Sequence, residues 1–173
     1  TPEEIEGIRE SGRRLGEIRR KVAAAAKPGV LTSELNKLAE ELIREGGDIP
    51  AFLHYTPKGA ERPYPAALCV SINDEIVHGI PNENPKELKA GDIVSLDFGL
   101  IHKGYITDSA VTVPIGDVTK IAQDILNTTK EALSRGIKAA RTGNKVGDIG
   151  NAIESYVRDK YGIITELGGH GVG

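Results

Sequence analysis

The 173-residue sequence contains no tryptophan, no methionine and a single cysteine, and only two of its residues are phenylalanine. The lone Cys69 cannot form an internal disulfide, so a disulfide-stapled secreted protein is disfavoured and a cytoplasmic location is the default expectation. No basic-then-apolar targeting signal opens the chain. Methionine is absent even at position 1, so either the initiator was removed ahead of Thr1 or the chain is an excised segment.

Long apolar runs and a strong excess of one charge are missing as well. The longest apolar runs are a few residues, so we expect no membrane span. Acidic and basic residues are interspersed, with a net charge of −3 and a pI near 5.8, so direct nucleic-acid binding is not expected. The length fits a single domain over residues 1–173 with a real core.

Apolar residues at helical spacing predict four helices. Thr1, Pro2 and Glu4 match a capping box with proline at the first helical position. Asp117 is the expected cap of the third helix. The predicted helices cover residues 2–26, 32–45, 118–140 and 146–160.

Residues 92–113 are the stretch around which the chain is organised, and they predict a β-hairpin. Alternate positions from 94 to 100 are apolar, whereas Ser95, Asp97 and Gly99 between them are small or acidic. If the loop is His102-Lys103, Asp97 lies directly opposite Asp108, with Cβ atoms about 5 Å apart. A loop one residue later shifts the register by one pair but keeps both acids on the same face. A bulged three-residue loop would separate them.

Two facing carboxylates repel each other, and strand interiors disfavour aspartate. They could be a pair of solvated surface acids, as a lone Asp usually is. However, Ser95 and Gly99 are small and should clear space around Asp97, and the other face of the hairpin is strongly apolar. A divalent cation between the acids would turn the repulsion into attraction. We therefore favour a metal site on this hairpin.

A second hairpin is predicted for residues 68–72 and 75–78, turning at Asn73-Asp74, which would place Cys69 opposite His78. A lone histidine is usually structural, so this pairing alone does not establish a role for His78. The preceding residues 48–65 hold four prolines together with Tyr64, which predicts a long loop.

A weak internal repeat relates two parts of the chain at an offset of 114 residues. Residues 25–29 align with 139–143, and Glu34-Leu35 aligns with Asp148-Ile149. Each part starts with a long helix, a glycine turn and a second helix. We therefore predict pseudo-repeats of about 1–115 and 116–173, the second without its set of strands.

Three motifs together resemble the methionine aminopeptidases, most closely the short bacterial type I class. They are residues 77–81 (Val-His-Gly-Ile-Pro), the pair of Asp97 and Asp108, and residues 169–173 (Gly-His-Gly-Val-Gly). The resemblance implies an α+β pita-bread fold, with an antiparallel sheet, helices on one side and an incomplete second half. It also implies removal of the N-terminal methionine from nascent polypeptides, with the ribosome as a plausible partner.

The resemblance further implies a site of five ligands for one or two divalent ions of Co, Mn, Fe or Zn. Asp97 would chelate one ion, Asp108 would bridge both, and His170 would bind the other. His78 would contact the substrate backbone as a catalytic group, and Tyr64 and Cys69 would line the methionine side-chain pocket. In the family, a metal-bound water attacks the carbonyl of the first residue.

The two glutamate ligands and a second histidine of the family would lie beyond Gly173. We therefore expect the 173-residue chain to be weakly active or inactive by itself. Without the last strands, a sheet edge should be open to self-association. Two alternatives remain: a non-catalytic pita-bread binding module, for which the missing glutamates argue, and a proline-specific peptidase relative, which X-Pro and Met-Ala peptides would distinguish.

Overall fold

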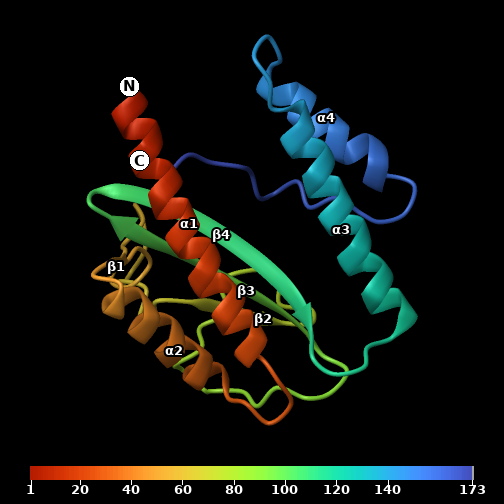
Figure 1. Cartoon of the computed structure of the whole chain (residues 1–173). Coiled ribbons are helices and arrows are strands. Elements are labelled where there is room, and N and C mark those ends of the chain that lie inside the picture. The colour runs from red at the N-terminus through yellow and green to blue at the C-terminus, as the bar shows by residue number, and fades with distance from the viewer. Residues whose placement is uncertain (173) are drawn as a thin grey trace. The chain divides into compact units, whose positions relative to one another are not determined.

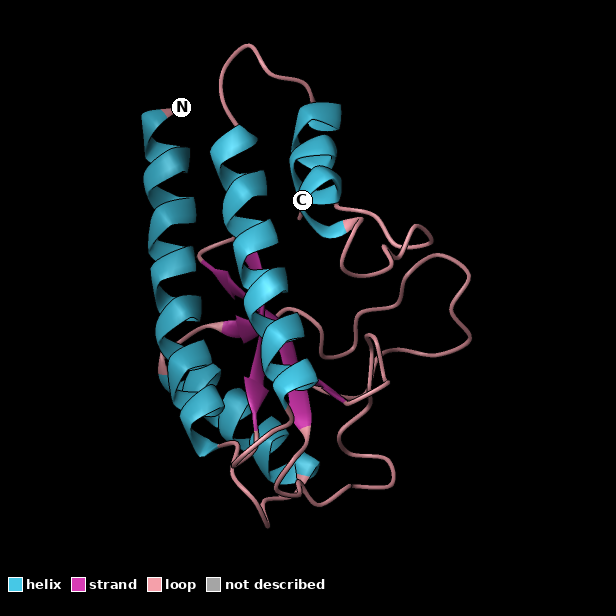
Figure 2. Cartoon of the chain, turned by 90° about the vertical axis from the view of Figure 1, so that its right-hand side faces the viewer, coloured by secondary structure: helices cyan, strands magenta, loops and turns pink. Residues whose placement is uncertain are grey.

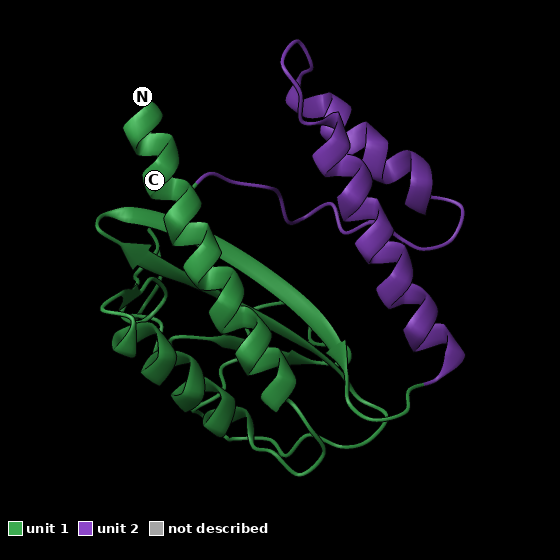
Figure 3. Ribbon diagram, in the orientation of Figure 1, with its two compact units in different colours: residues 1–118, 172–173 green, residues 119–171 purple. Residues whose placement is uncertain are grey.

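The computed structural model describes residues 1–172, which form two compact units. Residues Thr1–Val118 make up most of unit 1, and Thr119–Gly171 make up unit 2 (Figure 3). Within residues 1–172, no helix is both long enough and apolar enough to cross a bilayer.

Two helices open unit 1 where the sequence predicts them. Helix α1 (Pro2–Ala25) has Thr1 as its cap: the Glu4 amide donates to the Thr1 hydroxyl oxygen at 3.3 Å, and the Glu4 carboxylate accepts in return. Helix α2 (Thr32–Glu45) stops at Gly46. Both predictions are confirmed, because the capping and the apolar stripes are local features of the sequence.

The sheet of unit 1 is antiparallel and is built around one long central strand. The four strands are β1 (Ile49–Pro50), β2 (Cys69–Ile72), β3 (Ile93–His102) and β4 (Tyr105–Pro114). Strand β4 pairs with one edge of β3, whereas β2 and β1 pair with successive parts of the other edge. Long loops join β1 to β2 and β2 to β3 (Figure 2).

Helices α1 and α2 cover one face of this sheet, where the core lies (Figure 1). The alternate residues of β3 that were predicted to be apolar and inward are fully buried, as are Leu15 and Val22 of α1. Because successive strand residues point to opposite faces, burying this set leaves the set with Asp97 on the other face. The fold therefore presents the acids on the side of the sheet away from the helices.

Polar contacts of the buried Asp48 join the two helices to the end of β3. The Asp48 carboxylate, just after α2, lies 2.6 Å from Nδ1 of His102 and 3.3 Å from Nη1 of Arg14 on α1. His102, a candidate loop residue in the sequence, is the last residue of β3. His102 occupies an inward position of β3, so its burial follows from the strand alternation, whereas its partner Asp48 is distant in the sequence.

Unit 2 is a helical hairpin of α3 (Lys120–Ala139) and α4 (Val146–Val157). The expected cap Asp117 is wrong: the hydroxyl oxygen of Thr119 accepts the Ala122 amide at 3.1 Å instead, so α3 begins two residues later. Gly136 allows the helices to approach, because a Cβ there would lie 3.0 Å from the Ile153 side chain.

Candidate active site

The two acids share one face of the β3–β4 hairpin but do not lie directly opposite each other. Asp97 pairs with Ala110, and Asp108 pairs with Gly99. The His102-Lys103 loop is therefore wrong, and the alternative loop Lys103-Gly104 is correct. Its two residues have positive φ angles of 50° and 86°, as a type I′ turn requires. Residues in this diagonal relation lie about 7 Å apart.

The acid face, which is the face of the hairpin that carries Asp97 and Asp108, is accessible to solvent at the two carboxylates and covered at one end. Asp108 is exposed and Asp97 is half-buried. The expectation that Gly99 clears space is wrong, because Gly99 is buried beneath Ala51 and Phe52. The Ala51 amide donates to the Gly99 carbonyl at 3.1 Å. Gly99 thus admits a neighbouring segment, which bounds the acid face on that side.

Cys69 lies beside the acids, although not opposite His78. Strand β2 pairs with β3, so the Cα partner of Cys69 is Asp97, and residues 75–78 form no strand. The predicted second hairpin is therefore wrong. Burial raises the pKa of the Cys69 thiol to about 11, and the negative charges of Asp97 and Asp108 act in the same direction. The thiol is consequently neutral and lies within the electrostatic reach of both carboxylates.

Tyr64 reaches this cluster from the long loop before β2. Its hydroxyl donates to the Gly79 carbonyl at 3.1 Å and lies next to the Cys69 thiol. Burial, followed by the effect of Cys69, raises the pKa of Tyr64 well above its usual value. The half-buried Tyr64 and the buried Cys69 thus lie together beside Asp97, and their predicted role in lining a substrate pocket stays a prediction.

His78 is exposed and is held by its backbone. Its φ of 62° is unusual for a residue with a side chain, and Gly79 follows it directly. The Val70 amide donates to the Gly79 carbonyl at 2.9 Å, and the Gly79 amide donates to the Ser71 hydroxyl at 3.1 Å. The loop carrying His78 is therefore fastened to β2, and the imidazole is left accessible to solvent.

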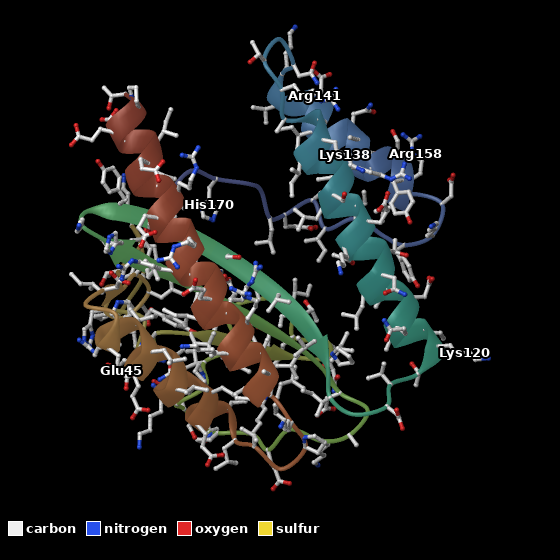
Figure 4. All side chains as sticks on the ribbon, viewed as in Figure 1. Glu45, Lys120, Lys138, Arg141, Arg158 and His170 are labelled. Carbon is white, nitrogen blue, oxygen red and sulfur yellow. The ribbon has the colours of Figure 1, made fainter. Side chains whose placement is uncertain are left out.

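His170 belongs to unit 2 and follows α4 in an extended segment (Figure 4). Its side chain is exposed, and Nδ1 lies 2.8 Å from the Gly171 carbonyl oxygen. The structure does not place unit 2 relative to unit 1. The proposed contribution of His170 to the same site as Asp97 and Asp108 therefore stays a prediction.

The donor chemistry of the hairpin fits a divalent cation only in part. Two carboxylates on one open face suit Mn²⁺, Fe²⁺, Co²⁺ or Zn²⁺. Among residues 1–172, however, no three His, Cys, Asp or Glu side chains are close enough to hold an ion. The assignment of Asp97 and Asp108 as metal ligands therefore stays a prediction, and a bound ion would need further donors.

A family model for metallopeptidase family M24 matches residues 6–173. The chain belongs to metallopeptidase family M24. It is 49% identical over 172 residues to a methionine aminopeptidase of Aquifex aeolicus, covering 98% of this chain and 66% of that relative. It is 37% identical to methionine aminopeptidase 1 of Bacillus subtilis, covering 100% of this chain and 67% of the relative. The resemblance drawn from the sequence motifs is confirmed.

Solved M24 structures confirm the fold. The methionine aminopeptidase of Rickettsia prowazekii superposes with a TM-score of 0.84 at 35% identity, over 92% of this chain and 61% of that chain. The methionine aminopeptidase of Thermotoga maritima superposes with a TM-score of 0.85 at 33% identity, with the same coverage. Aminopeptidase P of Escherichia coli, at 21% identity and 0.76, shows the fold alone. The α+β pita-bread architecture is therefore established. The chain spans about two thirds of the two methionine aminopeptidase sequences compared above, and 33% of aminopeptidase P.

Proposed function

We propose that this chain carries the first part of the active site of a metal-dependent methionine aminopeptidase. The observation that supports this most directly is the cluster on one side of the β3–β4 hairpin. Asp97 and Asp108 share the open face. Cys69 is the partner of Asp97 in the pairing of β2 with β3, and Tyr64 lies next to Cys69. Carboxylates for a metal thus adjoin a largely apolar wall that could receive a methionine side chain.

Each residue has a distinct task in this proposal. Asp97, Asp108 and His170 would hold the metal, which when bound lowers the pKa of a water molecule and polarises the substrate carbonyl. The exposed His78 would contact the backbone near the scissile bond. Tyr64 and Cys69 would bind the first side chain, and the neutral state of the thiol suits a thioether group.

Activity of the 173-residue chain by itself is proposed to be low. The family site implied by the sequence uses two glutamates after His170, and no acidic residue follows His170 in this chain. An assay on Met-Ala peptides with added Co²⁺ or Mn²⁺ should therefore show little turnover. Turnover at the rate of the longer relatives would overturn this part of the proposal.

Metal binding is the more direct test. Calorimetric titration of the metal-free chain with Mn²⁺ and Co²⁺ should show about one ion per chain. Asp108→Asn should abolish the binding, whereas Asp117→Asn, which removes an exposed acid after β4, should retain it. Absence of binding to the unmodified chain would refute a working half-site and favour a non-catalytic binding module.

The proposed substrate is a nascent polypeptide, which places the reaction in the cytoplasm and close to the ribosome. A proline-specific activity is the alternative, and hydrolysis of X-Pro peptides in preference to Met-Ala peptides would support it. We also propose self-association through β4, whose only strand partner within residues 1–172 is β3. Sedimentation that shows a monomer at all concentrations would contradict it.

A further inference from the structure

Two loops meet beside Cys69, and three connections made by side chains join them. The first loop, residues 51–65, carries Tyr64, and the second, residues 79–83, follows His78. The Tyr64 hydroxyl donates to the Gly79 carbonyl, and the Asn82 side-chain amide donates to the Pro65 carbonyl at 3.1 Å. Arg62 and Glu83 form the third connection, an ion pair.

The Arg62–Glu83 pair is bidentate. Nη1 and Nη2 of Arg62 donate to the two carboxylate oxygens of Glu83 at 2.5 and 2.7 Å. The pair raises the pKa of Arg62 and lowers that of Glu83, so both groups stay charged at neutral pH. Two parallel hydrogen bonds fix the orientation of the groups as well as their separation.

The position of the pair makes it relevant to the pocket wall. Arg62 is two residues from Tyr64, and Glu83 is four residues from Gly79, the acceptor of the Tyr64 hydroxyl. Inside the first loop, the Tyr64 backbone is fixed by hydrogen bonds with His54 and Tyr55, both 2.9 Å. These internal bonds shape the loop but do not attach it to the rest of the site.

We propose that Arg62 and Glu83 are a positioning pair that holds Tyr64 against the Cys69 thiol and so fixes the wall of the substrate pocket. The identity of this wall as a pocket for the first substrate residue rests on the proposed function. The attachment of the two loops to each other does not.

Cys69 is the only thiol in the chain and is 3% exposed, so it reports on opening of this wall. We would measure its rate of alkylation by excess iodoacetamide at pH 8 in Arg62→Gln and in Glu83→Gln. Each variant should react about two- to five-fold faster than the unmodified chain, the range expected for losing an exposed ion pair.

Both variants must change the rate in the same direction. A direct electrostatic effect on the thiol would act in opposite directions, because Arg62→Gln removes a positive charge and Glu83→Gln removes a negative one. The double variant Arg62→Glu/Glu83→Arg should restore the original rate. Glu131→Gln breaks a comparable exposed pair with Arg135 on α3 and should leave the rate unchanged.

The urea midpoint of each variant separates positioning from general stability. We expect unchanged midpoints together with faster alkylation. The proposal would be overturned if the alkylation rates of the two single variants stayed unchanged or moved in opposite directions. It would also be overturned if the double variant failed to restore the rate, or if the urea midpoints fell in proportion to the increase in alkylation rate. The thiol measurement needs neither metal nor substrate, so its outcome is independent of whether the proposed peptidase function holds.

Discussion

The two faces of the β3–β4 hairpin differ completely, although the same two strands build both. On one face, Leu96 and Phe98 have no exposed surface beneath the helices. On the other face, Asp97 is half-buried and Asp108 is exposed. The apolar face fixes the two strands, and these strands carry both acids on the face that water reaches. Stability and the proposed chemistry are thus assigned to opposite sides of one hairpin.

The largest effect is expected on the buried face. Phe98→Ala should lower the free energy of unfolding by about 3–5 kcal/mol, because it removes a fully buried ring and leaves a cavity. Urea denaturation measures this loss. A loss below about 1 kcal/mol would show that the buried face does not determine the stability of the hairpin.

Gly99 lies at the covered end of the acid face. Gly99→Ala should lower the free energy of unfolding by about 2 kcal/mol. The added Cβ would lie 2.7 Å from the Thr107 carbonyl oxygen and 3.2 Å from the Ala51 side chain. Gly147→Ala on α4 is the control: it meets no neighbouring atom within 4 Å and should stabilise slightly through helix propensity. Equal effects of the two substitutions would contradict the close approach at Gly99.

Ionisation of the Cys69 thiol should make the free energy of unfolding depend on pH in the alkaline range. Its folded-state pKa of about 11 lies above the ordinary value of 9.0, so the unfolded chain loses the thiol proton first as the pH rises. The contribution of Cys69 is therefore complete below pH 9 and is lost between pH 9 and 11, by about 1 kcal/mol at pH 10. The difference between the urea midpoints at pH 8 and pH 10 should be smaller in Cys69→Ala than in the unmodified chain. An identical pH dependence in both proteins would refute this assignment.

The smallest stability effect is expected from the acids. Asp108 is exposed, so Asp108→Asn should change the free energy of unfolding of the metal-free chain by less than about 1 kcal/mol. Urea denaturation in EDTA measures this change. Combined with lost binding in the metal titration, a change this small would support a role of Asp108 in binding rather than in stability. A clear destabilisation in EDTA would instead give Asp108 a structural role.

Local signals in the sequence predicted the helices and the faces of the main hairpin correctly. The capping box at Thr1 and the alternation along β3 are read from neighbouring residues, and both are confirmed. The register required a choice between two loops, which the positive φ values of Lys103 and Gly104 settle. Sequence alternation alone cannot make that choice, because a shift of one pair preserves the faces.

The errors concern contacts between distant residues. Asn73-Asp74 favours a turn, and Asn73 has a φ of 55°, but the partner of β2 is β3, more than twenty residues further along. Cys69 was expected beside His78 and lies beside Asp97 instead. The pairing of Arg62 with Glu83 gave no signal either, since charged residues in two polar loops are common and their proximity depends on the folded sheet.

Gly79 determines where substitutions can be accepted around His78. A Cβ at position 79 would lie 2.1 Å from the Val70 carbonyl oxygen, so no other residue fits without moving the backbone of β2 or of the loop. The exposed side chain of His78 is restricted only by its backbone, because a φ of 62° disfavours β-branched residues and proline. A library randomised at position 78 should therefore yield folded proteins with several other side chains, whereas one randomised at position 79 should return almost only glycine.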